Sequence, residues 1–64
     1  MTTEQMTVVN ELKTNIDPMG YFELTNAGNV RYSLMHKDEY GIYETYRGII
    51  YPSGKRSENE GWTV

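Results

Sequence analysis

The N-terminal part of the chain has the hydrophobic periodicity of an amphipathic helix. Apolar side chains recur at spacings of three and four residues and form one stripe: Met6, Val8, Val9, Leu12 and Ile16. Thr2 followed by Gln5 has the capping-box pattern of a helix start. Asp17-Pro18 predicts the helix end, because the residue before a proline avoids the α region. The pattern predicts a tail of residues 1–2 and a helix over residues 3–16.

After a turn at Pro18-Met19-Gly20, the hydrophobic period changes to two. Residues 21–25 and 30–36 alternate apolar and polar side chains, as strands with one buried face do. The four residues between them contain Gly28, which supplies the positive φ that a hairpin connection needs. These two segments therefore predict a β-hairpin.

Residues 39–51 are harder to assign. Their apolar side chains also fit one face of a helix. Gly41 and Gly48, however, would each cost a helix interior about 1 kcal/mol. The other residues are mainly β-branched or aromatic, which favours a strand. We predict a third strand within residues 40–51, with a bulge at Gly48.

These elements predict an α+β fold in which the N-terminal helix packs on a three- to four-stranded antiparallel β-meander (αβββ). The chain forms a single domain, 1–64, with the meander over 21–51 and a polar loop or short strand over 53–64. The segment Lys55–Gly61 is expected to be loop. Trp62-Thr-Val64 is expected to form a short last strand, with Trp62 capping the core, or to remain loose. The expected core is Val8, Val9, Leu12, Ile16, Phe22, Leu24, Val30, Tyr32, Leu34 and part of Ile42–Ile50. No second helix covers the other face of the sheet, which would show Tyr21, Arg31, Met35 and several tyrosines.

The size and composition restrict the chemistry. A chain of 64 residues buries only about 60% of its unfolded surface, so it relies on an efficient core or on assembly. It has no Cys and a single histidine, His36, which excludes disulfides and leaves no thiolate or multi-histidine metal site. We expect no metal and no cofactor, and a homodimer is one candidate state.

Net charge and hydropathy suggest a soluble cytoplasmic protein. The formal charge is −3, with acidic and basic residues spread along the chain. The polar N-terminus does not resemble a signal peptide, and no apolar run approaches the ~20 residues of a membrane span. No membrane association is expected.

No catalytic constellation is evident. His36 could act as a proton shuttle and is near Asp38 and Glu39 in the sequence, but no serine occupies a recognisable nucleophile turn. Neighbouring carboxylates, such as Glu58 and Glu60, would need a cleft that a domain of this size cannot enclose. We predict that the protein is not an enzyme.

The densest chemical feature is a cluster of tyrosines. Four of the six tyrosines lie within residues 40–51 and are interleaved with Arg47. Tyrosine and arginine are enriched at binding hot spots, so this segment predicts a protein-interaction surface. The candidate partner-binding residues are Tyr40, Tyr43, Tyr46, Arg47 and Tyr51, with Lys55 and Arg56 at the rim.

Two functional hypotheses follow. The first is a small non-enzymatic module that binds or inhibits a larger protein through the tyrosine-rich sheet face. In size and composition the chain is like phage- or plasmid-encoded inhibitors of host enzymes. The alternative is a small sheet-based nucleic-acid-binding regulator, in which bases stack on tyrosines and Arg or Lys follow the phosphates. The acidic residues among the tyrosines favour a protein partner.

Overall fold

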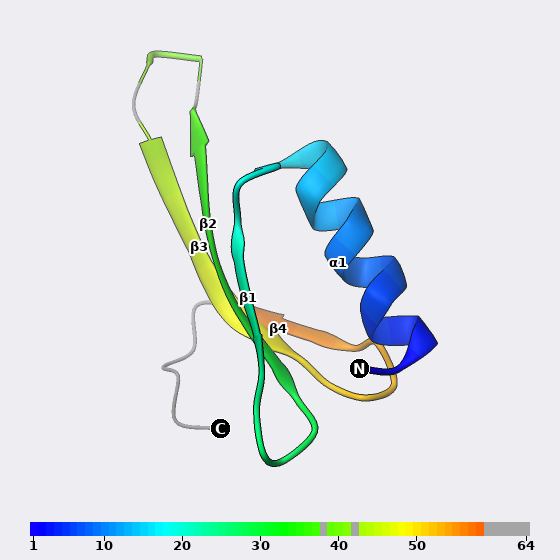
Figure 1. Ribbon diagram of the computed structural model, residues 1–64. Coiled ribbons are helices and arrows are strands. Elements are labelled where there is room, and N and C mark those ends of the chain that lie inside the picture. Colours follow the sequence, from blue (N-terminus) through cyan, green and yellow to red (C-terminus); the bar gives the residue numbers. More distant parts are fainter. Residues whose placement is uncertain (38, 42, 59–64) are drawn as a thin grey trace.

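A computed structural model describes residues 1–37, 39–41 and 43–58. Within these residues one helix packs against an antiparallel four-stranded sheet with the strand order β1-β2-β3-β4 (Figure 1). The elements are α1 (Thr3–Asn15), β1 (Tyr21–Leu24), β2 (Val30–Lys37), β3 (Tyr43–Ile50) and β4 (Arg56–Glu58). The predicted α+β meander is therefore confirmed.

Local hydrogen bonds define both ends of α1. The Thr2 hydroxyl accepts from the Gln5 backbone N–H at 3.1 Å, and the Gln5 side-chain oxygen accepts from the Thr2 backbone N–H at 2.8 Å. This reciprocal pair is the predicted capping box. At the other end, the backbone N–H groups of Ile16 and Asp17 both donate to the Leu12 carbonyl. The helix thus stops before Pro18, as the sequence indicates.

Residues 43–50 form a strand, which decides between the strand and helix readings of this segment. β3 pairs with β2 over its whole length, from Val30 opposite Ile50 to Lys37 opposite Tyr43. The predicted polar loop over Lys55–Gly61 is wrong in part, because Arg56–Glu58 form β4 and pair with Gly48–Ile50. The predicted last strand at Trp62–Val64 lies outside the described residues.

The bulge predicted at Gly48 is absent. Gly48 stands opposite Tyr32 on one side and Glu58 on the other, within an unbroken register. Glycine is required there for space, because a Cβ atom would overlap the Ser57 carbonyl oxygen and lie 2.6 Å from the Tyr32 hydroxyl oxygen. A central strand position without a side chain can mark close approach as well as a bulge.

The core lies between α1 and one face of the sheet. Its buried cluster is Val9, Leu12, Val30, Tyr32, Leu34 and Ile50, with Val8, Ile16, Phe22 and Tyr46 partly buried against it. The Lys13 ammonium lies over the Phe22 ring, 5.5 Å from its centroid. Leu24 was expected in this core but is 50% exposed, because it ends an edge strand. No described helix is long and apolar enough to cross a membrane.

A polar side chain, Gln5, is completely buried between the helix and the sheet. Its side-chain amide donates to the Gly28 carbonyl at 2.8 Å and to the Ile50 carbonyl at 3.1 Å. The Thr2 hydroxyl also donates to the Pro52 carbonyl at 2.7 Å. Polar contacts therefore connect the start of α1 to the β1–β2 turn and to the end of β3.

Candidate functional site: the open face of the sheet

The face of the sheet opposite α1 has no described element packed on it (Figure 1). We call it the open face. Because side chains alternate along a strand, the residues between the core positions belong to it. Its members are Tyr21, Glu23, Arg31, Ser33, Met35, Thr45, Arg47 and Ile49. Tyr21 is 47% exposed and Met35 is 53% exposed. Ile49, which stands opposite Arg31 on β2 and Ser57 on β4, is fully buried.

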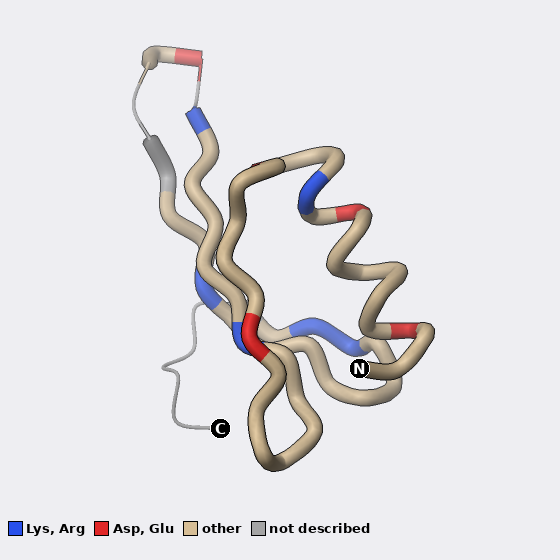
Figure 2. Tube along the Cα trace, viewed as in Figure 1, with Lys and Arg blue, Asp and Glu red and all other residues tan. Residues whose placement is uncertain are grey.

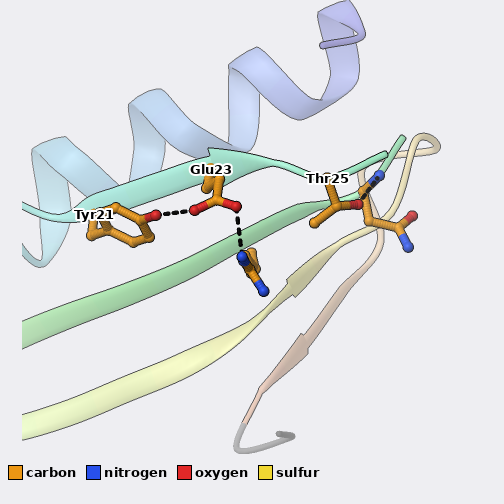
Figure 3. A network of polar contacts seen from close by, with 5 residues as sticks. Tyr21, Glu23 and Thr25 are labelled. Carbon is orange, nitrogen blue, oxygen red and sulfur yellow. Dashed lines mark hydrogen bonds and ion pairs between the residues drawn. The ribbon is translucent and has the colours of Figure 1, made fainter. Parts of the chain in front are cut away.

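A polar network spans β1 and β2 on the open face (Figure 3). The Tyr21 hydroxyl donates to one oxygen of the Glu23 carboxylate, and the Arg31 guanidinium contacts the other oxygen at 2.6 Å. Tyr21 and Glu23 are two positions apart and share a face, and the hairpin register places Arg31 opposite Glu23. The side chains therefore meet without any distortion of the strands.

The network changes the acidity of two of its members. The hydrogen bond from Tyr21, followed by the one from Arg31, lowers the pKa of Glu23 below its usual 4.5. The same hydrogen bond to Glu23 is the main reason that the pKa of Tyr21 lies above 10.0, because an ionised phenol could no longer donate it. The ionised carboxylate and the neutral phenol thus stabilise one another.

Arg47 adds a second cation to the open face. It stands opposite Ser33, and Thr45 stands opposite Met35. Ser33 in turn stands opposite Tyr21, so a row across three strands runs from Tyr21 through Ser33 to Arg47. Acidic and basic residues are interspersed along the described chain (Figure 2). The open face therefore combines an aromatic ring, an exposed methionine and mixed charge.

The predicted tyrosine surface is divided among several places. Tyr46 stands opposite Leu34 and packs against the core, on the face that α1 covers. Tyr40 lies in the β2–β3 connection and is 80% exposed. Tyr43 is the first residue of β3, opposite Lys37. Only some of the predicted residues thus belong to one surface.

The predicted residues at the other end of β3 lie in the β3–β4 connection. The Tyr51 backbone N–H donates to the Lys55 carbonyl at 2.8 Å, which closes the turn. Lys55 and Arg56 are exposed. Arg56 stands opposite Ile50, whereas Arg47 stands opposite Ser33 near the middle of β2. The structure therefore separates this charged group from Tyr40 by the length of β3.

The sequence pattern predicts Tyr21, Arg31 and Met35 on the uncovered face, whereas the contact between Glu23 and Arg31 is not predicted from it. The missing signal was the register of the hairpin, which a four-residue connection leaves undecided until its turn type is known. Once Thr25 N–H is seen to donate to the Asn29 carbonyl at 2.7 Å, the pairing of Glu23 with Arg31 follows.

Asp17 ties the end of the helix to the part of β2 that extends beyond β1. Its carboxylate accepts from the Met19 backbone N–H and from the Met35 backbone N–H, each at 2.9 Å. The His36 Nδ1 atom lies 3.4 Å from the Ile16 carbonyl oxygen. The carboxylate takes the place of a β1 partner, because β1 begins at Tyr21, opposite Ser33.

The described residues contain no group of three or more side chains that could hold a metal ion. The His36 ring contacts the helix end, and its predicted neighbour Asp38 lies outside the described residues.

No family model matches the chain, and no curated protein or solved structure matches it either.

Proposed function

We propose that the protein is a non-enzymatic interaction module that binds a larger protein through the open face of its sheet. One observation carries this proposal: α1 packs on one face only, and the other face presents Tyr21 and Met35 at about half exposure beside Arg47. Aromatic residues, Met and Arg are enriched in protein interfaces, whereas Lys and Glu are depleted.

The polar network preorganises two side chains of the open face for binding. Glu23 holds the Tyr21 hydroxyl and the Arg31 guanidinium at its two oxygens, so both side chains are ordered before a partner arrives. Immobilising such side chains on binding costs about 0.5–1.5 kcal/mol each, and prior ordering reduces that cost. Met35 supplies an adaptable apolar contact next to them.

The same network argues against nucleic acid as the partner. Binding to phosphates rests on cations that release counterions, and Arg31 is already neutralised by Glu23. A protein partner with polar and apolar patches fits the mixed charge better. Such binding would cover part of the partner's surface, which is how a small domain without catalytic groups can inhibit a larger enzyme.

The test compares two double variants with the wild type after each has been shown to fold by circular dichroism. Met35→Ala with Arg47→Ala changes the open face, and Glu11→Ala with Thr14→Ala changes the exposed side of α1. Partners captured by the wild type from a bacterial lysate are identified by mass spectrometry, and the affinity for the purified partner is then measured. We expect the open-face variant to bind roughly 30-fold more weakly, as for the loss of one hot spot. Equal affinity of both variants at equal folding would contradict the proposal.

A further inference from the structure

β1 is an edge strand of the sheet, because it is paired with β2 on one side only. The Thr25 N–H, one residue beyond β1, donates to the Asn29 carbonyl and therefore faces β2. Directions alternate along a strand, so the backbone groups of Phe22 and Leu24 point away from β2. We call this side of β1 the outer edge.

A second hydrogen bond leads to the same assignment. The Met35 N–H donates to the carboxylate of Asp17, which precedes β1, so it faces the β1 side of β2. Ser33 lies two residues before Met35 and faces the same side, and it stands opposite Tyr21. Tyr21 thus bonds to β2, and the next residue, Phe22, faces outward.

The outer edge is open in the part of the chain that the structure describes. Among the described residues, no group bonds to the N–H or C=O of Phe22 or Leu24 on this side. The segment Tyr-Phe-Glu-Leu contains no proline and no lysine, and its register with β2 has no bulge. A regular edge without such blocking features is a template for another strand. Because β1 has four residues, the strand that it can bind is short.

α1 lies along the outer edge and would cover one face of an added strand. In Figure 3, α1 runs beside β1 on the side away from β2. The Lys13 ammonium lies over the Phe22 ring, and Met6 is two turns earlier on the same side of the helix. Met6 is 45% exposed, and Leu24, which shares a face of β1 with Phe22, is 50% exposed. Apolar side chains and the Lys13 ammonium thus accompany backbone groups that can bond to a further strand.

We propose that the outer edge binds an extended segment of a protein partner, which adds to the sheet as a further strand beside β1. The outward N–H and C=O groups of Phe22 and Leu24 bond to the backbone of the segment. Apolar side chains at alternate positions of the segment pack toward α1, against Phe22, Leu24 and Met6. A carboxylate of the segment binds Lys13.

Charge complementarity favours an acidic segment. Lys13 is exposed beside the outer edge, and its described contact is with the Phe22 ring. On the other face of β1, the Glu23 carboxylate already binds Tyr21 and Arg31. The carboxylate of the segment is therefore expected on the side of the strand that faces α1.

A second copy of the chain fits this edge less well. Two β1 strands paired antiparallel would be related by a two-fold axis perpendicular to the joined sheet, which places both α1 helices on the same face. Because α1 runs beside β1 on its outer side, the two helices would meet over the axis (Figure 3). An axis at Glu23, which would use the bonds of both Phe22 and Leu24, would also oppose two carboxylates. A segment without a helix meets neither obstacle.

A synthetic peptide tests the edge before any partner is known. The probe is acetyl-Thr-Val-Thr-Val-Asp-amide, titrated into isotope-labelled protein and followed by nuclear magnetic resonance. In the free protein, the amides of Phe22 and Leu24 should exchange with solvent quickly, and those of Tyr21 and Glu23 slowly. With the peptide, the Phe22 and Leu24 resonances should shift and their exchange should slow. Protection of these two amides in the free protein, or no shift at ~5 mM peptide, would overturn the proposal.

A proline at position 24 tests the backbone bonds. Leu24→Pro removes the outward N–H and should preserve the fold, because edge strands accept proline where the N–H faces solvent. Leu24→Val keeps the N–H with a side chain of similar size. We expect Leu24→Pro to bind the peptide at least about fivefold more weakly than Leu24→Val, as for the loss of one hydrogen bond. Equal affinity would overturn the proposal. So would a Leu24→Pro chain that does not fold when Leu24→Val does, since the N–H would then be needed within the chain.

Charge variants test the orientation of the segment. Lys13→Glu should weaken peptide binding about threefold at low salt relative to Lys37→Glu, which changes an exposed lysine at the end of β2. Equal affinities would contradict the carboxylate at Lys13. The inference does not depend on the proposed function, so Met35→Ala with Arg47→Ala should bind the peptide as the wild type does. Loss of binding in that variant would show that the peptide occupies the open face, which overturns the proposal.

Discussion

Substitution of the buried glutamine by alanine, Gln5→Ala, is expected to remove a large part of the domain's stability. The Gln5 side chain is 0% exposed and makes three hydrogen bonds, to the backbones of Thr2, Gly28 and Ile50. Only the bond to Ile50 is fully buried, and the other two are partly exposed. All three backbone groups lose their partner in the variant, but they differ in how easily water can replace it.

The magnitude follows from that difference. A buried carbonyl left without a donor costs about 1–3 kcal/mol, whereas a partly exposed group that water can reach loses about 0.5–1.5 kcal/mol. The sum for the three groups is about 2–6 kcal/mol. A domain of 64 residues has a total stability of about 3–10 kcal/mol at the usual value per residue. The variant should thus be close to unfolding.

Urea denaturation followed by far-ultraviolet circular dichroism measures this effect. Met6→Ala is the matched control, because Met6 is the next residue on the helix and is 45% exposed. Gln5→Glu separates hydrogen bonding from packing: burial against two carbonyls should raise the pKa of the new carboxyl, so this variant should gain stability as the pH falls. If Gln5→Ala lowers the free energy of unfolding no more than Met6→Ala does, the buried amide is not the link described above.

Two further changes test the sheet. Gly48→Ala should destabilise by about 1–3 kcal/mol, because the added methyl group overlaps the Ser57 carbonyl and β4 must shift; an unchanged urea midpoint would contradict this. Glu23→Gln should weaken the acid sensitivity of the fold, because the pKa of Glu23 is lowered by its bonds to Tyr21 and Arg31. Its contribution is fully present above the unfolded value of 4.5 and is lost as the pH falls through the lower folded pKa. The melting temperatures of the wild type and of Glu23→Gln are measured over a series of acidic pH values. If both melting temperatures fall by the same amount with pH, the network does not contribute to the acid sensitivity.

The helix, the first hairpin and the third strand could be predicted because each is encoded locally. The capping pair at Thr2 and Gln5, the proline at position 18 and the alternation in residues 21–25 and 30–36 all act within a few residues. The prediction of a strand within residues 40–51 is also confirmed, since β3 covers Tyr43–Ile50. Two glycines and the β-branched residues outweigh the helical spacing of apolar positions there.

The remaining features depend on contacts between distant segments. Tyr46 looked like part of an exposed cluster, but its pairing with Leu34 turns it toward the core. β4 has too polar a sequence to signal a strand and forms because β3 offers it a partner at Gly48–Ile50. The burial of Gln5 had no local signal beyond its place in the cap. Strand register and the packing of the helix on the sheet decide these cases, and neither can be predicted from a short segment of sequence.

The bond between the Gln5 amide and the Ile50 carbonyl joins residues 45 positions apart in a chain of 64. A chain emerging from a ribosome therefore makes its helix first but cannot anchor that helix until nearly all of the sheet is present. Until then the apolar stripe of α1 has no surface to cover, and a helix of 13 residues alone is marginal in water. Folding should consequently be all-or-none, without a stable N-terminal intermediate, and its rate should be limited by the loop closure that brings the first turn of the helix to the end of β3.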